Sequence, residues 1–210
     1  MCNAYGTIGY SRSAFLHDLL GIPRNLDYDR PKKVVRPTDS VPVVRLADAG
    51  FEQLEMRWGL VPAWSKTMPE RPLTNARSET VDELKSFAEA FRSRRCVMPG
   101  DEFYEWIKGT KQRVTFRPKE EEFLFAGLWD RWNDGEKVIE SCVMLTTSAN
   151  DVVAPVHDRM PVVLKPEDCV KWLNSETAVE DLKKLLAPLE NELITLVEEI
   201  TPKSNQTSLF

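Results

Sequence analysis

Residues 95–106 read RCVMPGDEFYEW, which is a strand-like run, a tight Pro-Gly turn and a second strand-like run. Alternation with a period of two places Phe103 and Glu105 on one face of the second run. Tyr104 and Trp106 lie on the other face. A carboxylate among aromatic side chains on a half-buried strand is a candidate for a raised pKa and for general acid–base chemistry. The alternatives are a structural salt bridge for Glu105 and a place in the core for Trp106, whose indole otherwise suits stacking on a base.

Similar segments extend in both directions from this pair of strands. Further strands are predicted at residues 41–46, 54–60, 113–117, 123–129, 138–146, 160–164 and 193–198. Helical spacing and capping signals predict helices at residues 11–20, 81–91, 166–173 and 178–186. The short connectors favour a bent antiparallel sheet or open barrel flanked by helices, an α+β fold. We expect one compact domain over residues 1–210, with a core at 1–200 and a polar tail at 201–210.

The composition is that of an ordinary globular protein. Of the 210 residues, 42% are hydrophobic and 29% are charged, and no apolar run approaches the ~20 residues that a membrane span needs. The 4 cysteines are scattered and the chain has only 2 histidines, so neither a disulfide framework nor a zinc site is predicted. We expect a cytoplasmic monomer (nucleoid-associated if bacterial) that uses no metal and no cofactor.

The charge is divided unevenly along the chain. The net charge is −5, which argues against general binding to nucleic acid. Residues 1–117 carry 19 Lys and Arg against 15 Asp and Glu, whereas residues 118–210 carry 9 against 18. A modest basic surface from the first half would attract phosphates, and an ordinary solvated surface is the alternative.

The second residue, Cys2, carries distinctive chemistry if Met1 is removed, which is expected before a small side chain. The α-amine then condenses with an aldehyde to an imine, and the thiol closes on the imine to give a five-membered thiazolidine. Closure is intramolecular, so its effective molarity reaches the order of 10⁵ M. The amine titrates near ~8 and the thiol near ~8.5, so part of each is deprotonated at neutral pH. An arbitrary residue on a frayed terminus is the alternative for Cys2.

Two further polar segments are candidates for a site. Residues 74–80, TNARSET, precede a predicted helix, whose N-terminus favours anions, and Arg77 suits a bidentate phosphate contact. A plain capping segment is the alternative there. His157 lies in a polar turn before a predicted strand and titrates near neutral pH, which suits a proton shuttle. A structural histidine is the alternative.

Six blocks of the sequence together resemble a known family. They are Met1-Cys2, MRWGLVPAW at 56–64, NAR at 75–77, FYEW at 103–106, LTT at 145–147 and HDRMP at 157–161. In this order they resemble the SRAP family, the SOS response-associated peptidases, over roughly residues 1–165. The resemblance implies a compact α+β fold with the N-terminal cysteine at the base of a positively charged groove for single-stranded DNA. It also implies capture of abasic sites, whose ring-opened sugar presents the aldehyde that Cys2 needs.

The resemblance implies a role for each matching residue. Cys2 is the nucleophile and supplies both amine and thiol. Asn75 positions the amine and the sugar, Glu105 is the acid–base group, and His157 assists ring opening and reversal. The remaining roles are the pocket lining for Thr146, phosphate contacts for Arg77 and Arg159, and base stacking for Trp64 and Trp106.

Two departures from the family pattern concern the grip on DNA. Many relatives begin Cys-Gly-Arg, and the Arg touches the DNA backbone, whereas this chain has Cys2-Asn3-Ala4. The loop at 34–37, VVRP, also lacks the Asn-x-Ala-Pro pattern of many members. The Cys–Asn–Glu–His set is intact.

Two other functions compete with covalent capture of abasic DNA. One is a cysteine peptidase, in which the Cys2 thiolate attacks an amide with Glu105 or His157 as base, and which includes self-removal of Met1. The other is plain binding of DNA ends or junctions, with Cys2 incidental. Replacement of Cys2 separates the three functions.

Overall fold

A five-stranded barrel forms the centre of the protein in this computed structural model, which describes residues 2–7, 18–22, 33–119 and 122–198. Its strands are β3 (Ser40–Ala47), β4 (Gly50–Trp58), β6 (Arg95–Gly100), β9 (Phe123–Asn133) and β10 (Val138–Ser148). They pair in the order β10-β4-β3-β6-β9, and β9 pairs with β10 again, which closes the ring. Every pairing in the ring is antiparallel except the short parallel one between β10 and β4.

Alternation along the strands divides the core in two. In β6, Cys96 and Met98 join the cluster that fills the barrel, whereas Val97 joins the cluster beneath the helices. The barrel is tightly filled at Gly127, because a Cβ added there would lie 2.8 Å from the sulfur of Cys96 and 3.2 Å from that of Met98. A larger residue at position 127 therefore requires the barrel interior to repack.

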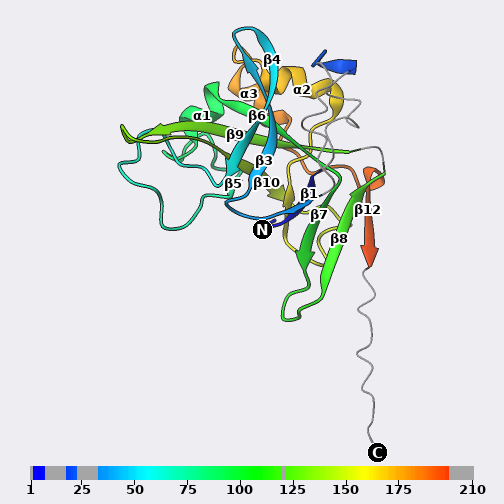
Figure 1. The fold of residues 1–210 in the computed structure, drawn as a ribbon. Coiled ribbons are helices and arrows are strands. Elements are labelled where there is room, and N and C mark those ends of the chain that lie inside the picture. Colours follow the sequence, from blue (N-terminus) through cyan, green and yellow to red (C-terminus); the bar gives the residue numbers. More distant parts are fainter. Residues whose placement is uncertain (1, 8–17, 23–32, 120–121, 199–210) are drawn as a thin grey trace, which may run out of the picture.

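A second sheet lies against the barrel. Its strands, in spatial order, are β12 (Ile194–Glu198), β8 (Arg113–Pro118), β7 (Glu102–Trp106), β1 (Tyr5–Thr7) and β2 (Lys33–Val35). Within this sheet β1, in dark blue in Figure 1, lies between β7 and β2. The ring of Tyr5 on β1 packs edge-on against Trp58 and Phe125 of the barrel, with centroids 5.3 and 5.5 Å apart. The N-terminal segment is thereby held between the two sheets.

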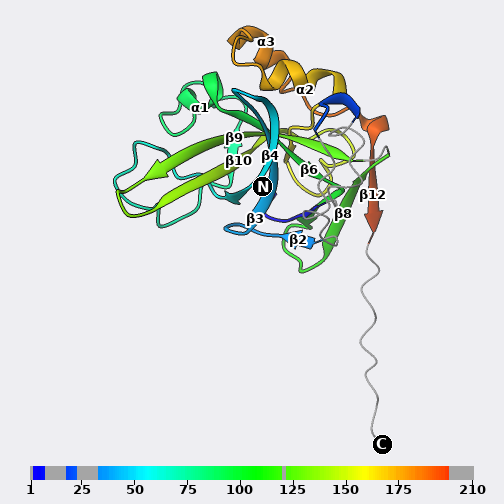
Figure 2. The same cartoon turned by 45° about the horizontal axis from the view of Figure 1, so that its top comes forward.

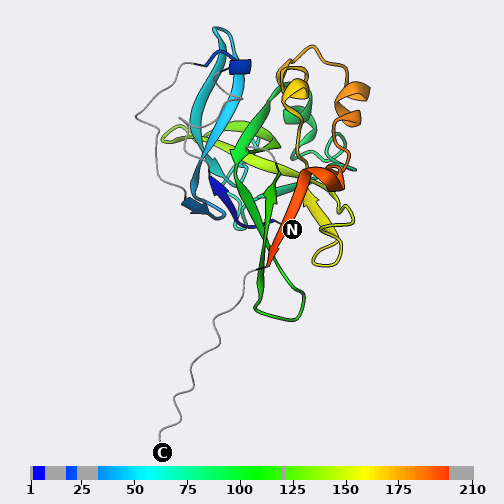
Figure 3. The ribbon, with the colours of Figure 1, turned by 90° about the vertical axis from the view of Figure 1, so that its right-hand side faces the viewer.

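The helices cover the outer face of the barrel. They are α1 (Ala88–Ser93), α2 (Pro166–Leu173), α3 (Val179–Lys184) and the 3₁₀ turn η4 (Asn191–Leu193). Figure 2 shows α2 and α3 together above the barrel strands, and Figure 3 shows them on one side of the barrel with β12 running along β8. Arg95, on β6, binds two of the helices. Its buried guanidinium donates hydrogen bonds of 2.5–2.7 Å to four carbonyls at the C-terminal ends of α1 and α2, namely those of Phe91, Arg92, Trp172 and Asn174.

The α+β class and most of the predicted elements are confirmed. The strands predicted at 41–46, 95–98, 102–107, 113–117, 123–129 and 138–146 are present, as are the helices predicted at 166–173 and 178–186. The strands predicted at 54–60, 160–164 and 193–198 correspond to β4, to β11 (Arg159–Pro161) and to β12. The helix predicted at 11–20 falls mostly outside the described residues.

Two predictions about the segment at 74–91 are wrong. The helix expected at 81–91 is reduced to α1, because turns with backbone bonds such as Leu84 N to Thr80 O occupy residues 78–87. Apolar side chains at helical spacing are buried equally well by these turns. The preceding NAR is not a helix N-terminus but a short strand, β5 (Asn75–Arg77). An anion site built on a helix dipole is therefore excluded at this position.

Candidate active site

Cys2 lies in the extended segment that precedes β1, and only 1% of it is exposed. Its thiol donates a 3.2 Å hydrogen bond to the carbonyl of Ala4. Burial, and next the negative charge of Glu105, raise the pKa of the thiol to about 12. The thiol is therefore protonated at neutral pH, and its reaction as a nucleophile requires a nearby base.

Glu105 is the base that the fold places beside Cys2. Strand β7 pairs with β1 through Tyr5 opposite Phe103, and the backbone N–H of Tyr104 donates to the carbonyl of Ala4 at 3.1 Å. Glu105 is the next residue of β7 after Tyr104, and only 4% of it is exposed. Burial raises the pKa of its carboxyl to about 7. Both protonation states are therefore populated near neutral pH, as acid–base chemistry demands.

Asn75 reaches the N-terminal segment from β5. This strand pairs in parallel with β10, which places Asn75 opposite Met144. The side-chain Nδ2 of Asn75 donates a 2.9 Å hydrogen bond to the carbonyl of Cys2, across 73 residues of sequence. Its Oδ1 is buried and has no hydrogen-bond partner among the residues that the structure describes. Asn75 thus fixes the backbone of Cys2 and keeps one acceptor for another donor.

His157 completes the predicted set from the turn before β11. Its Nδ1 lies 3.0 Å from the backbone N–H of Arg159, which donates to it, and 3.0 Å from Oδ1 of Asp158. Burial lowers the pKa of the imidazole, which favours the neutral form. The negative charge of Asp158 raises the pKa of Glu105, which places the two segments within electrostatic range of each other.

Thr146 and Arg159 lie where β5, β10 and β11 meet. Thr146 is fully buried, and its carbonyl accepts hydrogen bonds from the N–H of Ser78 at 2.9 Å and from Nη2 of Arg159 at 2.6 Å. The guanidinium of Arg159 also holds the carboxylate of Glu79 through Nη1–Oε1 and Nη2–Oε2 contacts of 2.5 and 2.9 Å. Arg159 is therefore at the site, but a carboxylate occupies its guanidinium.

The other three predicted contact residues are exposed. The backbone of Arg77, at the end of β5, accepts a hydrogen bond from the N–H of Thr80, whereas its exposed guanidinium makes no hydrogen bond or ion pair with the described part of the chain. Trp64 is 50% exposed and Trp106 is 36% exposed, so a place in the core is excluded for Trp106. The ammonium of Lys85 lies 4.3 Å above the ring of Trp64, whose Nε1 donates to the carbonyl of Lys85. These side chains are accessible to a large ligand.

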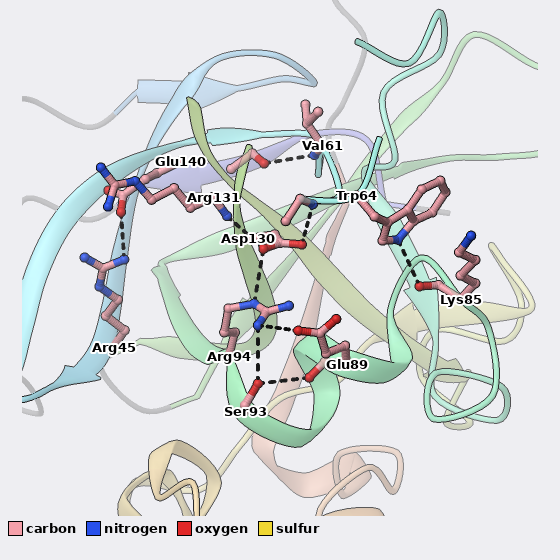
Figure 4. Close-up of polar contacts among 12 residues, drawn as sticks. Arg45, Val61, Trp64, Lys85, Glu89, Ser93, Arg94, Asp130, Arg131 and Glu140 are labelled. Carbon is pink, nitrogen blue, oxygen red and sulfur yellow. Dashed lines mark hydrogen bonds and ion pairs between the residues drawn. The ribbon is translucent and has the colours of Figure 1, made fainter. Parts of the chain in front are cut away.

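A polar network fixes the turn that carries Trp64. Figure 4 shows Asp130 at its centre, between the guanidinium of Arg94 and the backbone of the turn. The carboxylate of Asp130 accepts a 2.8 Å hydrogen bond from the N–H of Ala63, and the hydroxyl of Ser141 accepts one of 2.9 Å from the N–H of Val61. The backbone that leads to Trp64 is thus held by two barrel strands.

Comparison with known proteins agrees with this geometry. The family model described as SOS response associated peptidase (SRAP) matches residues 1–203. The chain belongs to the SRAP family. It is 34% identical over 194 residues to Abasic site processing protein YoqW of Bacillus subtilis, with 86% of this chain and 85% of that protein covered. It is 31% identical over 218 residues to Abasic site processing protein HMCES of Mus musculus, with 81% and 62% covered.

A solved structure confirms the fold of this SRAP chain. A protein from Bacteroides thetaiotaomicron, known from a crystal structure, superposes with a TM-score of 0.81 at 25% sequence identity. The match covers 92% of this chain and 91% of the other. The barrel, the second sheet and the covering helices are therefore shared SRAP architecture.

The described part of this SRAP chain contains no group of three or more His, Cys, Asp or Glu residues that would hold a metal ion. Its 4 cysteines are buried, and none forms a disulfide. Within the same residues, no helix has the length and apolar character to cross a membrane.

Sequence reasoning missed two residues of this SRAP site, Glu79 and Asp130. Glu79 was read only as part of a capping segment, and Asp130 lies at the end of a predicted strand. Their partners, Arg159 and the Ala63 backbone, are 80 and 67 residues away in sequence. No local pattern links residues at such separations.

Proposed function

We propose that this SRAP protein captures abasic sites in single-stranded DNA by forming a thiazolidine crosslink through Cys2 after removal of Met1, which lies outside the described residues. The observation that carries the proposal is the buried Cys2, with its carbonyl held by Asn75 and with Glu105 beside it titrating near pH 7. The names of the related abasic site processing proteins support the choice of substrate.

The proposed reaction balances with Glu105 as the only proton carrier. The amine of Cys2 adds to the aldehyde of the ring-opened sugar to give a carbinolamine. Protonated Glu105 gives its proton to the hydroxyl, which leaves as water, and an iminium remains. The Glu105 carboxylate then takes the proton of the Cys2 thiol while the sulfur bonds to the iminium carbon. This closes the ring and restores protonated Glu105, so the raised pKa of the thiol is no obstacle.

The other site residues hold the substrate in this scheme. The buried Oδ1 of Asn75 accepts a hydrogen bond from the amine of Cys2 or from a hydroxyl of the sugar. His157, whose lowered pKa favours the neutral imidazole, assists opening of the sugar ring and reversal of the crosslink. Exposed Arg77 supplies phosphate affinity without sequence choice, and the two exposed indoles offer surfaces for stacked bases.

The peptidase alternative has weaker support. A cysteine peptidase activates its nucleophile by lowering the pKa of the thiol, usually with an adjacent imidazolium or helix N-terminus. Here burial and Glu105 raise that pKa to about 12. The mechanism through an imine needs no resting thiolate, so it fits this environment better.

A denaturing gel tests the proposed function. The mature protein, with loss of Met1 confirmed by intact mass, is incubated with single-stranded DNA containing one abasic site, with undamaged single-stranded DNA and with duplex DNA. We expect a heat-stable shifted band with the abasic single strand alone, because only that DNA presents an accessible aldehyde. No band with Met1 verifiably absent would refute the crosslinking function.

The acid–base role of Glu105 predicts a particular pH profile. Crosslinking slows at low pH as the amine is protonated, and slows above about pH 7 as Glu105 loses the proton it must donate. In Glu105→Gln the maximal rate falls about 10²-fold and the alkaline decline disappears. Single-turnover rates of crosslinking, measured from about pH 5 to about pH 9, test this profile.

A matched control for this profile is Glu52→Gln, which removes a half-exposed carboxylate at the far end of the β3–β4 hairpin. It should retain both the rate and the bell shape. An alkaline decline that persists in Glu105→Gln would assign that ionisation to another group.

A further inference from the structure

The ion pair between Arg159 and Glu79 has the form of an occupied phosphate site. A guanidinium presents parallel N–H donors that fit carboxylates and phosphates in the same bidentate way. Glu79 fills that fork with both carboxylate oxygens, at 2.5 and 2.9 Å. The Arg159 side chain is 12% exposed and the Glu79 side chain 51% exposed, so the carboxylate lies on the solvent side of the pair. A ligand arriving from solvent meets Glu79 first.

The pair also lies where the backbone of a bound DNA strand must pass. Nη2 of Arg159 is 3.4 Å from the hydroxyl of Thr146. The backbone N–H of Arg159 donates to Nδ1 of His157. Thr146 in turn pairs with β5, which carries Asn75 and so holds Cys2. A sugar bonded to Cys2 has a phosphate on each side, and Arg159 is connected to Cys2 through Thr146, β5 and Asn75. Nε of Arg159 is buried and has no hydrogen-bond partner in the described part of the chain.

We propose that Glu79 is a specificity-determining residue: it occupies the phosphate-binding fork of Arg159 in the free protein, and a DNA phosphate must displace it. The inference rests on the proposed function only in taking DNA as the ligand. Because an intramolecular carboxylate competes with every phosphate, reversible binding to undamaged DNA is weakened. An abasic strand is held by a covalent bond and loses less from this competition. Glu79 thus increases discrimination in favour of damaged strands.

Displacement also changes the salt dependence of binding. In the wild-type protein the charge of Arg159 is already neutralised by Glu79, and the displaced carboxylate must take up a cation from solution. Exchange of one anion for another therefore releases no net counterion at this position. With glutamine at position 79, the contact with phosphate releases a counterion, and the plot of log K against log salt steepens by about 0.7 for a single strand.

The test is equilibrium binding of an undamaged oligothymidylate strand to wild-type and Glu79→Gln protein over a series of salt concentrations. We expect the variant to bind roughly 3–10-fold more tightly at low salt, with a steeper salt slope. The ratio of abasic to undamaged strand captured in a competition should fall. Unchanged affinity and unchanged slope would overturn the proposal. Weaker binding would also overturn it, because it would make Glu79 a brace that holds Arg159 in place.

Glu52→Gln is the control for the general effect of removing one negative charge. Glu52 pairs with Arg45 at 2.6 Å and its side chain is 43% exposed, which matches Glu79 closely. Arg45 also contacts Glu140 near the start of β10, six residues or about 20 Å from Thr146. We expect Glu52→Gln to leave the salt slope unchanged. An equal increase in affinity in both variants would reduce the effect to net charge and overturn the proposal.

The outcome is independent of the crosslinking chemistry. Undamaged DNA presents no aldehyde, so binding and salt slope are measured without an adduct. Failure of the wild-type protein to crosslink abasic DNA would refute the proposed function and leave the displacement of Glu79 standing. A normal crosslink with no effect of Glu79→Gln on DNA binding would support the proposed function and refute the displacement of Glu79. Urea unfolding of both variants verifies that each is folded at the temperature of the assay.

Discussion

Cys2→Ala protein is expected to form no heat-stable adduct with abasic single-stranded DNA, the largest effect of any single substitution. The variant keeps the terminal amine and still forms an imine, but it has no sulfur to close the ring. Imines hydrolyse under denaturing conditions, whereas the intramolecular thiazolidine persists. Binding to undamaged DNA should be unchanged, because the 1% exposed side chain of Cys2 offers no surface to the backbone.

Two further variants sharpen this expectation. Cys2→Ser preserves a donor to the carbonyl of Ala4, so it retains the local structure. It should yield an adduct only when borohydride reduces the imine before denaturation. Cys169→Ser replaces another buried thiol that donates to a backbone carbonyl, that of Lys165, and should crosslink normally. A heat-stable band that survives in Cys2→Ala would show that the thiol takes no part in the bond.

The second large effect is expected on stability, from Arg95→Met. Arg95 is 3% exposed and provides hydrogen bonds to four carbonyls at the ends of α1 and α2. Its positive charge also lies at the negative ends of both helix dipoles. Methionine fills a similar volume but leaves the four acceptors without this donor, and the contacts to Phe91 and Trp172 are buried. We expect a loss of about 3–5 kcal/mol in the free energy of unfolding, measured by urea denaturation.

Arg95→Lys separates charge from geometry. Burial lowers the pKa of Arg95 to about 10, which still leaves it charged at neutral pH, and a lysine keeps a charge with fewer and differently directed donors. We expect Arg95→Lys to lose less free energy of unfolding than Arg95→Met does. The control is Arg92→Met on the exposed face of α1, which should cost about 0.5 kcal/mol or less. A similar small loss for Arg95→Met would show that the helices do not depend on the four bonds.

The sequence was most informative where patterns are local. The strands from Arg95 to Ser148 are apolar runs that end at turn residues, so the fold class followed from them. The helix expected at 81–91 failed because apolar spacing reports burial and not the backbone bonds that achieve it. Strand β5 was missed because it has three residues and pairs in parallel with β10, about 70 positions later. Neither the closure of β9 on β10 nor this pairing has a local signal.

The candidate site likewise combines features with a local sequence signal and contacts between distant residues that have none. The chemistry of a terminal cysteine can be predicted from residue types alone, Glu105 and His157 were candidates from their local sequence, and the resemblance supplied Asn75. The bond from Asn75 to the Cys2 carbonyl and the pairing of Arg159 with Glu79 join residues 73 and 80 positions apart. Such contacts depend on the whole sheet arrangement, and no sequence pattern indicates that Glu79 is the partner of Arg159.

The burial of Cys2 between the two sheets also has a kinetic consequence. Cys2 is synthesised well before its neighbours in the folded site, Asn75, Glu105 and the β10 segment. At about 5–20 residues per second, the N-terminal segment waits on the order of 10 s for them. Long-range strand pairing then closes slowly compared with local structure. We therefore expect removal of Met1, on which the proposed chemistry depends, to take place during translation, before Cys2 is buried.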